Sequence, residues 1–213
     1  MKQRTDAEDD LHLWRGLPTS AVSDTMGRVG AMDAGISRLS GDSLVGRAYP
    51  VWTAAGDNST IHLAVNAAPS GAVLVVDAEG HLGRAVWGHV LTVAAQRRGL
   101  SGAVIDSAVR DIDEVRARGF PIYARGVCPA GPHKGFLGRH GARAQCGGVT
   151  VALGDLILGD ADGVSVVPAS EMDAVLPRVR EKIATEAEWM RRIEEGVSTV
   201  DILGIGADHA SQG

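Results

Sequence analysis

The residues best suited to chemistry are an arginine and an aspartate that end a run of apolar residues. In the stretch VIDSAVRDIDEV, residues 104–115, Arg110 and Asp111 stand where a simple turn would need only Gly, Asn or Ser. A guanidinium offers a planar pair of donors to a carboxylate, or to an oxygen that gains negative charge. Asp111, which we expect to point away from Arg110, suits a hard cation such as Mg²⁺, which keeps most of its water ligands.

The same residues also have a plain structural interpretation. Acids in the first turn of a helix favour the helix dipole, and an exposed arginine beside them forms a surface ion pair of little energy. Arg110-Asp111-x-Asp113-Glu114 fits this pattern, and the residues taken alone favour it slightly.

A second candidate for ligand binding is the turn Gly88-His89-Val90-Leu91, which opens a predicted helix. The first N–H groups of a helix have no partner within the helix, so backbone donors here could hold a carboxylate. Gly88 has no side chain, which would let a ligand approach closely.

These candidates need a scaffold, and the central part of the chain alternates between apolar runs and helical patterns. Apolar or β-prone runs predict strands over residues 44–54, 72–76, 102–105 and 120–124. Helical spacing predicts helices between them, over about 58–68, 88–98 and 111–118. This order predicts βαβ units with parallel strands. Ligands then gather in the loops at the carboxyl ends of the strands, here residues 77–88 and 106–111.

The two ends of the chain and residues 142–167 have a different pattern. Residues 142–167 contain short strands separated by Gly-Asp and Asp-Gly turns, which is typical of antiparallel hairpins. Helices are expected within residues 1–28, over about 6–17 and through Met26, and a long charged helix over 169–195. We therefore expect one α/β domain spanning residues 1–213, with helices at both ends.

Composition limits the classes of partner. The 213 residues carry a formal net charge of −5 and no Lys/Arg-rich run, which argues against a nucleic-acid surface. There is no secretory signal pattern and no stretch of ~18 apolar residues, so we expect a cytoplasmic protein that does not bind a membrane. Cys128 and Cys146 lack the spacing of a zinc or redox motif, and we expect reduced thiols.

A Gly/Pro-rich segment, GPHKGFLGRHG at residues 131–141, carries three cationic or titratable side chains. Lys134, His133 and Arg139 could cover a pocket and contact a distal carboxylate of a ligand. A mobile surface loop is an equally good interpretation of the same residues.

The segment GHVLTVAAQRRGLSGAVIDSAVRDIDEVRARGFPIYARG, residues 88–126, resembles the RraA-like family, which includes 4-hydroxy-4-methyl-2-oxoglutarate aldolases and oxaloacetate decarboxylases. The resemblance continues in the segments TSAVSD, AGDN, VVD and GDADGV, at residues 19–24, 55–58, 75–77 and 159–164. It implies a swivelling β/β/α domain. It also implies assembly as a homotrimer or hexamer with active sites at the subunit interfaces.

The resemblance also implies roles for single residues. Arg110 would bind pyruvate, Asp111 would hold a divalent metal, Mg²⁺ or Mn²⁺ or another, and the amides of Gly88–Leu91 would hold the pyruvate carboxylate. Glu114 matches a family acid three positions after the metal ligand, and either orients metal-bound water or is an ordinary helix acid. His89 stands where family aldolases often have an acid, and it could relay a proton or be a plain surface histidine.

The function implied is that of a divalent-metal-dependent class II pyruvate aldolase, a lyase that cleaves 4-hydroxy-4-methyl-2-oxoglutarate-type 2-oxo acids. Oxaloacetate decarboxylation passes through the same pyruvate enolate, so one site could perform both reactions. The alternative is an RraA-type regulatory protein that inhibits ribonuclease E by protein contact. A methyltransferase is disfavoured, because the chain lacks the glycine-rich loop after a first strand that binds adenosylmethionine.

Overall fold

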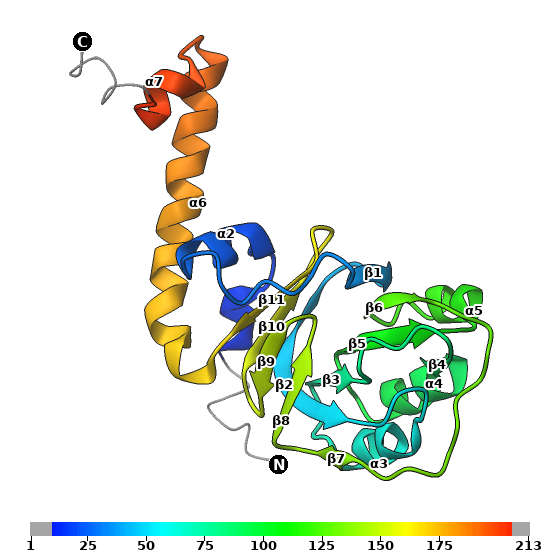
Figure 1. The fold of residues 1–213 in the computed structure, drawn as a ribbon. Helices are drawn as coiled ribbons and strands as arrows, with labels where there is room; N and C mark the ends of the chain where they lie inside the picture. The colour runs from blue at the N-terminus through cyan, green and yellow to red at the C-terminus, as the bar shows by residue number, and fades with distance from the viewer. Residues whose placement is uncertain (1–9, 206–213) are drawn as a thin grey trace, which may run out of the picture.

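Among residues 10–205, which the computed structural model describes, nine strands form one mixed sheet (Figure 1). Its order is β1-β6-β5-β3-β2-β10-β11, with β4 paired to β5 and β7 paired to β2. The strands are β1 Ser37–Ser40, β2 Leu44–Trp52, β3 Ala72–Asp77, β4 Ala85–Trp87, β5 Gly102–Val109, β6 Ile122–Val127, β7 Arg139–His140, β10 Leu156–Gly159 and β11 Val164–Val167. The predicted α/β class is confirmed.

The centre of the sheet is parallel, as the βαβ pattern predicts. β2 pairs with β3, β3 with β5, and β5 with β6, all in parallel, whereas β1, β10 and β11 pair antiparallel. Helices α3 (Ser59–Ala67), α4 (His89–Arg97) and α5 (Ile112–Ala117) cover one face of this parallel part (Figure 1). β3 and β5 are buried almost throughout, which explains why their sequences are apolar runs without alternation.

The other face of the parallel strands is covered by a hairpin. It consists of β8 (Arg143–Cys146) and β9 (Val149–Ala152), which pair antiparallel and form a second, two-stranded sheet. Cys146 and Val151 from the hairpin pack with Met32 and Ile36 against the strands. The sheet core is thus closed on both sides, and functional groups are left at the ends of the strands.

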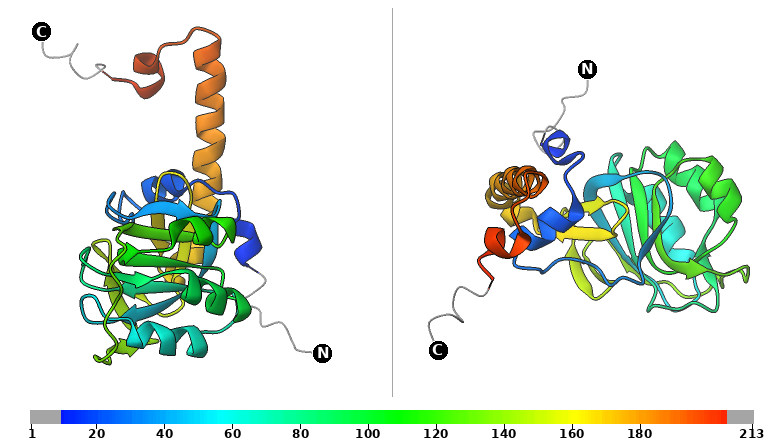
Figure 2. Two further views of the ribbon diagram at one scale, coloured as in Figure 1. Left: turned by 90° about the vertical axis from the view of Figure 1, so that its right-hand side faces the viewer. Right: turned by 90° about the horizontal axis from the view of Figure 1, so that it is seen from above.

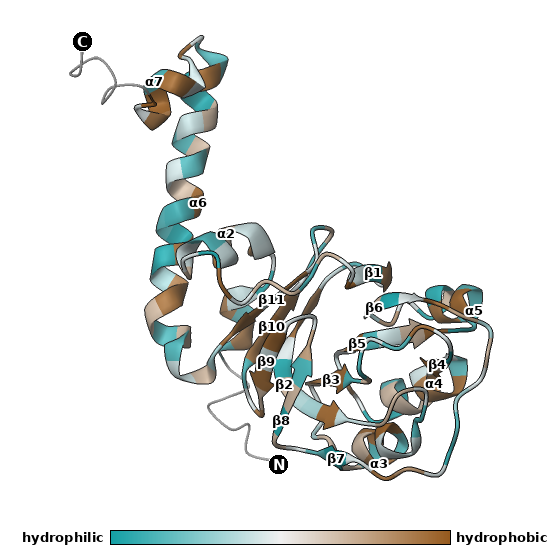
Figure 3. Cartoon of the chain, in the orientation of Figure 1, coloured by the Kyte–Doolittle hydropathy of each residue, from teal (hydrophilic) through white to brown (hydrophobic). Residues whose placement is uncertain are grey.

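A third apolar cluster joins the antiparallel edge to the terminal helices. Trp14 and the helix α2 (Thr19–Thr25) pack against β10, β11 and the start of α6 (Met172–Glu194). Beyond this contact α6 extends away from the body and is followed by α7 (Thr199–Leu203) (Figure 2). The shaft of α6 is mainly hydrophilic, whereas its base and α7 show apolar residues (Figure 3).

Four expectations about single elements differ from the structure. Of the helix predicted over residues 6–17, residues 6–9 lie outside the described part, and the rest forms only the 3-10 turn η1, Leu11–Trp14, because Gly16 turns the chain with φ 77°. The strand predicted over 102–105 continues to Val109. β4 lies inside the segment predicted to be a loop over 77–88. The helix predicted over 169–195 is observed as η2, Ala169–Glu171, followed by α6.

Within residues 10–205, no helix combines the length and the apolar character needed to cross a membrane.

Candidate active site

A cavity of about 160 Å³ lies at the carboxyl ends of β2, β4 and β5, the strands that precede α3, α4 and α5. Its volume suits a small organic acid better than a drug-sized ligand. The lining combines an apolar floor with polar residues from four segments: Asn58, His62, Ala85, Val86, Trp87, Gly88, Val90, Leu91, Arg110, Asp111, Pro132 and Lys134. Five of the residues predicted for the site, Gly88, Val90, Leu91, Arg110 and Asp111, are therefore brought together.

Arg110 lies at the end of β5, where its backbone N–H donates to the Trp87 carbonyl at 3.0 Å and so joins the ends of β4 and β5. Its guanidinium donates no hydrogen bond to any residue in the described part of the chain. The nearest charge is the Asp111 carboxylate, with 3.7 Å between Arg110 Nε and Asp111 Oδ2. The expectation that Asp111 points away from Arg110 is therefore wrong, because the carboxylate lies beside the guanidinium at the edge of the cavity.

Asp111 has a backbone conformation that explains this position. Its φ of 55° and ψ of 44° place it in the left-handed region, which a residue other than glycine adopts at a cost of roughly 1–3 kcal/mol. It occupies the N-cap position of α5, yet its side chain makes no cap hydrogen bond there. Instead Asp111 Oδ2 accepts the N–H of His89, at 3.1 Å, from the start of α4. Capping of its own helix thus does not explain the residue.

Gly88 is required at this junction for steric reasons. A Cβ added at Gly88 would lie 2.6 Å from Asp111 Oδ2 and 3.0 Å from Arg110 Cγ. Its φ of −167° is ordinary extended backbone, so conformational freedom is not the reason for the glycine. The absence of a side chain lets the Arg110-Asp111 turn lie directly against the first turn of α4.

The start of α4 faces the cavity, but two predicted residues do not line it. Val90 and Leu91 are in the lining, and their N–H groups belong to the first helical turn, which has no partners within the helix. The His89 ring is outside the lining, and its Nε2 receives a hydrogen bond from Arg118 Nε at 3.3 Å. Glu114 is exposed in the first turn of α5 and is also outside the lining.

Two residues of the lining, Asn58 and His62, are absent from the sequence-based prediction. They follow β2, a third strand whose carboxyl end reaches the cavity. The loop after β2 was not among the two loops predicted to gather ligands. Asn58 Nδ2 donates to the Val86 carbonyl at 3.1 Å, which leaves its buried Oδ1 without a hydrogen-bond partner in the described residues. Burial and the charge of Lys134 lower the pKa of His62, so its ring is neutral at pH 7.

The segment 131–141 closes one side of the cavity, although only part of it takes the predicted role. Pro132 and Lys134 are in the lining. His133 is not, and the Arg139 guanidinium lies over the Trp52 ring, 4.9 Å from its centroid. The segment is held by backbone hydrogen bonds, including His133 N–H to the Gly56 carbonyl at 2.8 Å.

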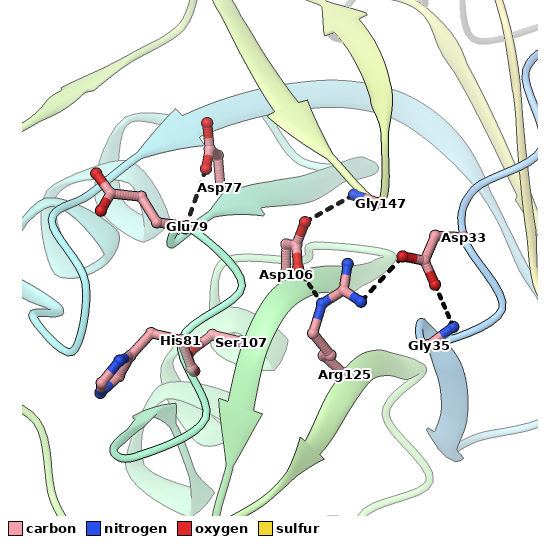
Figure 4. Close-up of polar contacts among 9 residues, drawn as sticks. All are labelled: Asp33, Gly35, Asp77, Glu79, His81, Asp106, Ser107, Arg125 and Gly147. Atoms are coloured by element: carbon pink, nitrogen blue, oxygen red, sulfur yellow. Dashed lines mark hydrogen bonds and ion pairs between the residues drawn. The ribbon is translucent and has the colours of Figure 1, made fainter.

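A second group of charged residues, built on Asp106 of β5 and Arg125 of β6, lies on the face covered by the β8–β9 hairpin (Figure 4). Arg125 donates from Nε to Asp106 at 2.5 Å and from Nη1 to Asp33 at 3.1 Å. Asp106 also accepts the Gly147 N–H at 2.8 Å. Every charge in this group therefore has a partner within the protein.

No group of three or more His, Cys, Asp or Glu side chains that could hold a metal is found in the described residues. A divalent cation here would have Asp111 as its protein ligand. Asp111 Oδ2 is already engaged by the His89 N–H, whereas Oδ1 accepts no hydrogen bond from a described residue. One free carboxylate oxygen at a cavity edge fits Mg²⁺, which takes its other ligands from water and substrate.

The comparison with protein families matches residues 19–166 to the RraA-like model, described as Aldolase/RraA. This chain belongs to the RraA-like family. A relative from Halalkalibacterium halodurans, named "Putative 4-hydroxy-4-methyl-2-oxoglutarate aldolase", is 36% identical over 193 residues, which are 90% of this chain and 92% of the relative.

Solved structures agree with this assignment of the fold. An uncharacterized protein from Pseudomonas syringae has a TM-score of 0.82 at 28% identity, with 95% of this RraA-like chain and 96% of that chain covered. The structure described as "RNA-processing inhibitor RraA from Thermus thermophilis" has a TM-score of 0.65 at 28% identity, with coverage of 71% and 92%.

Proposed function

We propose that this RraA-like protein is a divalent-metal-dependent class II pyruvate aldolase that cleaves 4-hydroxy-4-methyl-2-oxoglutarate-type 2-oxo acids and also decarboxylates oxaloacetate. The observation that carries the proposal is the junction of Arg110 and Asp111 with the start of α4. There a guanidinium with no hydrogen bond to a described residue, a carboxylate oxygen that accepts none from a described residue, and the amides of the first turn of α4 share one small cavity. The name of the Halalkalibacterium relative supports the aldol cleavage.

The substrate carboxylate would lie against the amides of Val90 and Leu91, where the positive end of the helix dipole favours an anion. Arg110 would lie beside the keto oxygen and donate to it. These contacts fix the orientation of the 2-oxo acid unit, and the apolar walls of Val86 and Trp87 exclude water behind it.

In the cleavage step, a base removes the proton of the 4-hydroxyl group and a new carbonyl forms at C4. The C3–C4 bond breaks, and its electron pair passes into the 2-oxo acid unit to give the enolate of pyruvate. Arg110 stabilises the negative charge that develops on the former keto oxygen, in a site where few waters compete. Protonation at C3 then releases pyruvate. For oxaloacetate, loss of CO₂ leaves the same enolate.

Asp111 would hold Mg²⁺, Mn²⁺ or another divalent ion, which supplies Lewis acidity at the oxygen that gains charge. Glu114 remains a predicted contact to metal-bound water, and it is exposed in this structure. Two candidates for the base are His89 acting through water and an acid from a neighbouring subunit. The hydrogen bond from Arg118 to His89 Nε2 would have to open before His89 could accept a proton at that atom.

We further propose the assembly that the family resemblance implies, a homotrimer or hexamer with sites at the subunit interfaces. Partners would then be the small 2-oxo acid and other copies of this chain, with no nucleic acid and no membrane. A monomeric variant that kept full turnover would contradict the interface site.

The test is pyruvate release from 4-hydroxy-4-methyl-2-oxoglutarate and from oxaloacetate, with Mg²⁺, with EDTA, and in the Asp111→Asn variant. We expect release that requires the metal and that falls by at least ~100-fold in the variant, because Asn replaces the charged ligand with a neutral one. Release from neither substrate by the wild-type protein would overturn the proposal. A circular dichroism spectrum shared by both proteins would exclude misfolding of the variant.

The likeness to a structure described as an RNA-processing inhibitor favours one alternative, a regulator that inhibits ribonuclease E by protein contact. This function needs no cavity chemistry. Inhibition of purified ribonuclease E that is unchanged in Asp111→Asn, together with no pyruvate release, would support it.

A further inference from the structure

The helix α5 begins directly after Asp111, and its position depends on contacts with neighbouring elements. It has six residues, and a helix this short is not stable in water without packing. One set of contacts joins it to β1, where Ser40 Oγ donates to the Val115 carbonyl at 3.2 Å and Arg116 Nε donates to the Leu39 carbonyl at 3.0 Å. A second set joins α5 to α4, and these contacts decide how Asp111 lies against the start of α4.

A single residue of α4, His89, is bonded at both ends of α5. Its backbone N–H donates to Asp111 Oδ2 at 3.1 Å, at the start of α5. Its ring accepts at Nε2 the Nε–H of Arg118, the residue that follows α5, at 3.3 Å. The neutral ring therefore carries its own proton on Nδ1. Movement of α5 along α4 would strain or break one of these two hydrogen bonds.

The backbone of Arg118 is also held by α4, which fixes the point from which its side chain extends. Gln96 donates from Nε2 to the Arg118 carbonyl at 3.2 Å. Gln96 and His89 are about two turns apart on α4, so they lie on the same face of that helix. The Arg118 side chain thus runs along this face, from the level of Gln96 back to the His89 ring.

Asp111 needs support of this kind because its backbone is strained. A left-handed conformation in a residue other than glycine persists where the surrounding structure enforces it. Within α5, the Val115 N–H donates to the Asp111 carbonyl at 2.9 Å. Among the described residues, the His89 N–H is the one hydrogen-bond donor to the Asp111 carboxylate. A shift of α5 relative to α4 would therefore release this carboxylate to rotate.

We infer that Arg118 is a positioning residue of the active site, which holds the His89 ring and, through it, the His89 N–H against the Asp111 carboxylate. Arg118 is outside the cavity lining. The inference rests on the proposed function for the role of Asp111 as the metal ligand. With Arg118 at Nε2 and the proton on Nδ1, the ring has no free acceptor, so the inference also removes His89 from the candidates for the base.

The first test measures metal binding without turnover, with Mn²⁺ as the probe. The variants are Arg118→Met, His89→Ala and the double variant, and His89→Ala removes the ring but keeps the N–H. We expect each single variant to raise the Kd for Mn²⁺ about 10-fold in isothermal titration calorimetry, the size expected when the support of a metal ligand is lost. The double variant should bind no more weakly than either single variant, because both substitutions remove the same contact.

The matched control is Arg97→Met, which makes the same change of charge on α4. Arg97 is exposed in the last turn of α4 and has no hydrogen bond or ion pair with a described residue. We expect its Kd for Mn²⁺ to equal that of the wild type. Unchanged affinity in Arg118→Met, or additive losses in the double variant, would overturn the inference. A lower kcat in His89→Ala alone, with Mn²⁺ affinity unchanged, would instead identify His89 as the base.

The second test needs neither metal nor substrate. Hydrogen exchange at the His89 amide, resolved to the single residue, reports its hydrogen bond to Asp111. We expect exchange about 5- to 10-fold faster in Arg118→Met, the size of one weakened hydrogen bond, at an unchanged urea midpoint because Arg118 is exposed. If the wild type bound no Mn²⁺, the metal dependence in the proposed function would be wrong. Faster exchange in Arg118→Met would then still support the positioning role, and unchanged exchange would overturn it too.

Discussion

Two arginine–aspartate groups involve β5, one within the strand and one directly after its end, and they differ in how much of their charge the protein itself uses. Arg125 is bonded to Asp106 and Asp33, and Asp106 has a further donor in the Gly147 N–H (Figure 4). Arg110 and Asp111 are 3.7 Å apart, and the guanidinium has no hydrogen bond to a described residue. The first group joins segments of the chain, whereas the second keeps its hydrogen-bonding capacity for a ligand.

Exposure follows the same division. The side chains of Arg125 and Asp106 are 21% and 12% exposed, whereas those of Arg110 and Asp111 are 41% and 38% exposed. A poorly hydrated charge must be paired within the protein, whereas a hydrated charge can stay unpaired until a ligand binds. The same residue types therefore serve the fold in one place and are available for chemistry in the other, and substitutions should separate the two roles.

The largest effect is expected from Arg110→Met. Loss of a donor to a developing negative charge costs about 100- to 1000-fold in turnover. The free energy of unfolding should change by no more than about 0.5 kcal/mol, because no described residue loses a hydrogen bond. Pyruvate release and urea denaturation measure the two quantities. A marked loss of stability would mean that Arg110, like Arg125, serves the fold.

Arg125→Met should give the opposite result. Asp106 would remain poorly exposed with only the Gly147 N–H as a donor, and breaking such a pair costs on the order of 3 kcal/mol in the free energy of unfolding. Urea denaturation provides the measurement. Arg143→Met, at an exposed position of β8, is the control and should cost less than about 0.5 kcal/mol. Equal stability of the two variants would contradict the division of roles.

A smaller effect is expected from Gly88→Ala, which tests how closely the active pair must lie against α4. The added Cβ would displace the Asp111 carboxylate from its position 2.6 Å away, and with it the hydrogen bond from the His89 N–H. We expect kcat/KM to fall about 10- to 100-fold, the cost of misplacing a reacting group by about an ångström. Unchanged kcat/KM would show that this contact does not position the carboxylate.

The sequence predicts the scaffold well where the relevant interactions are local. The apolar runs that became β3 and β5 and the helical spacing of α3 and α4 are properties of adjacent residues, so they could be read directly. The length of β5 could not. Asp106 and Ser107 look like the start of a loop, and in the buried strand their side chains are satisfied from distant positions by Arg125, the Gly147 N–H and the His81 carbonyl.

The candidate site shows the same limit. Arg110, Asp111 and the start of α4 could be grouped because loops at the carboxyl ends of parallel strands converge. The hydrogen bond from His89 N–H to Asp111 could not be predicted, since it depends on the left-handed conformation of one residue. The backbone position of Lys134 depends on Asp57, whose carboxylate accepts the N–H of Gly135 across a sequence separation of 78 residues.

The smallest effect should come from Asp33, at the exposed end of the Arg125 group. The hydrogen bond from the Gly35 N–H, and to a smaller extent the Arg125 guanidinium, lower the pKa of the Asp33 carboxyl from its ordinary value of 3.8. The folded protein therefore binds this proton less tightly than the unfolded chain does. The stabilisation is present above pH 3.8 and is lost as the pH falls through the lowered pKa of the folded state. Asp33→Asn should thus have a slightly lower urea midpoint than the wild type at pH 7, and the two midpoints should converge as the pH falls below 3.8. A difference that stays constant between neutral and acidic pH would show that shape, and not the charge of Asp33, holds the segment in place.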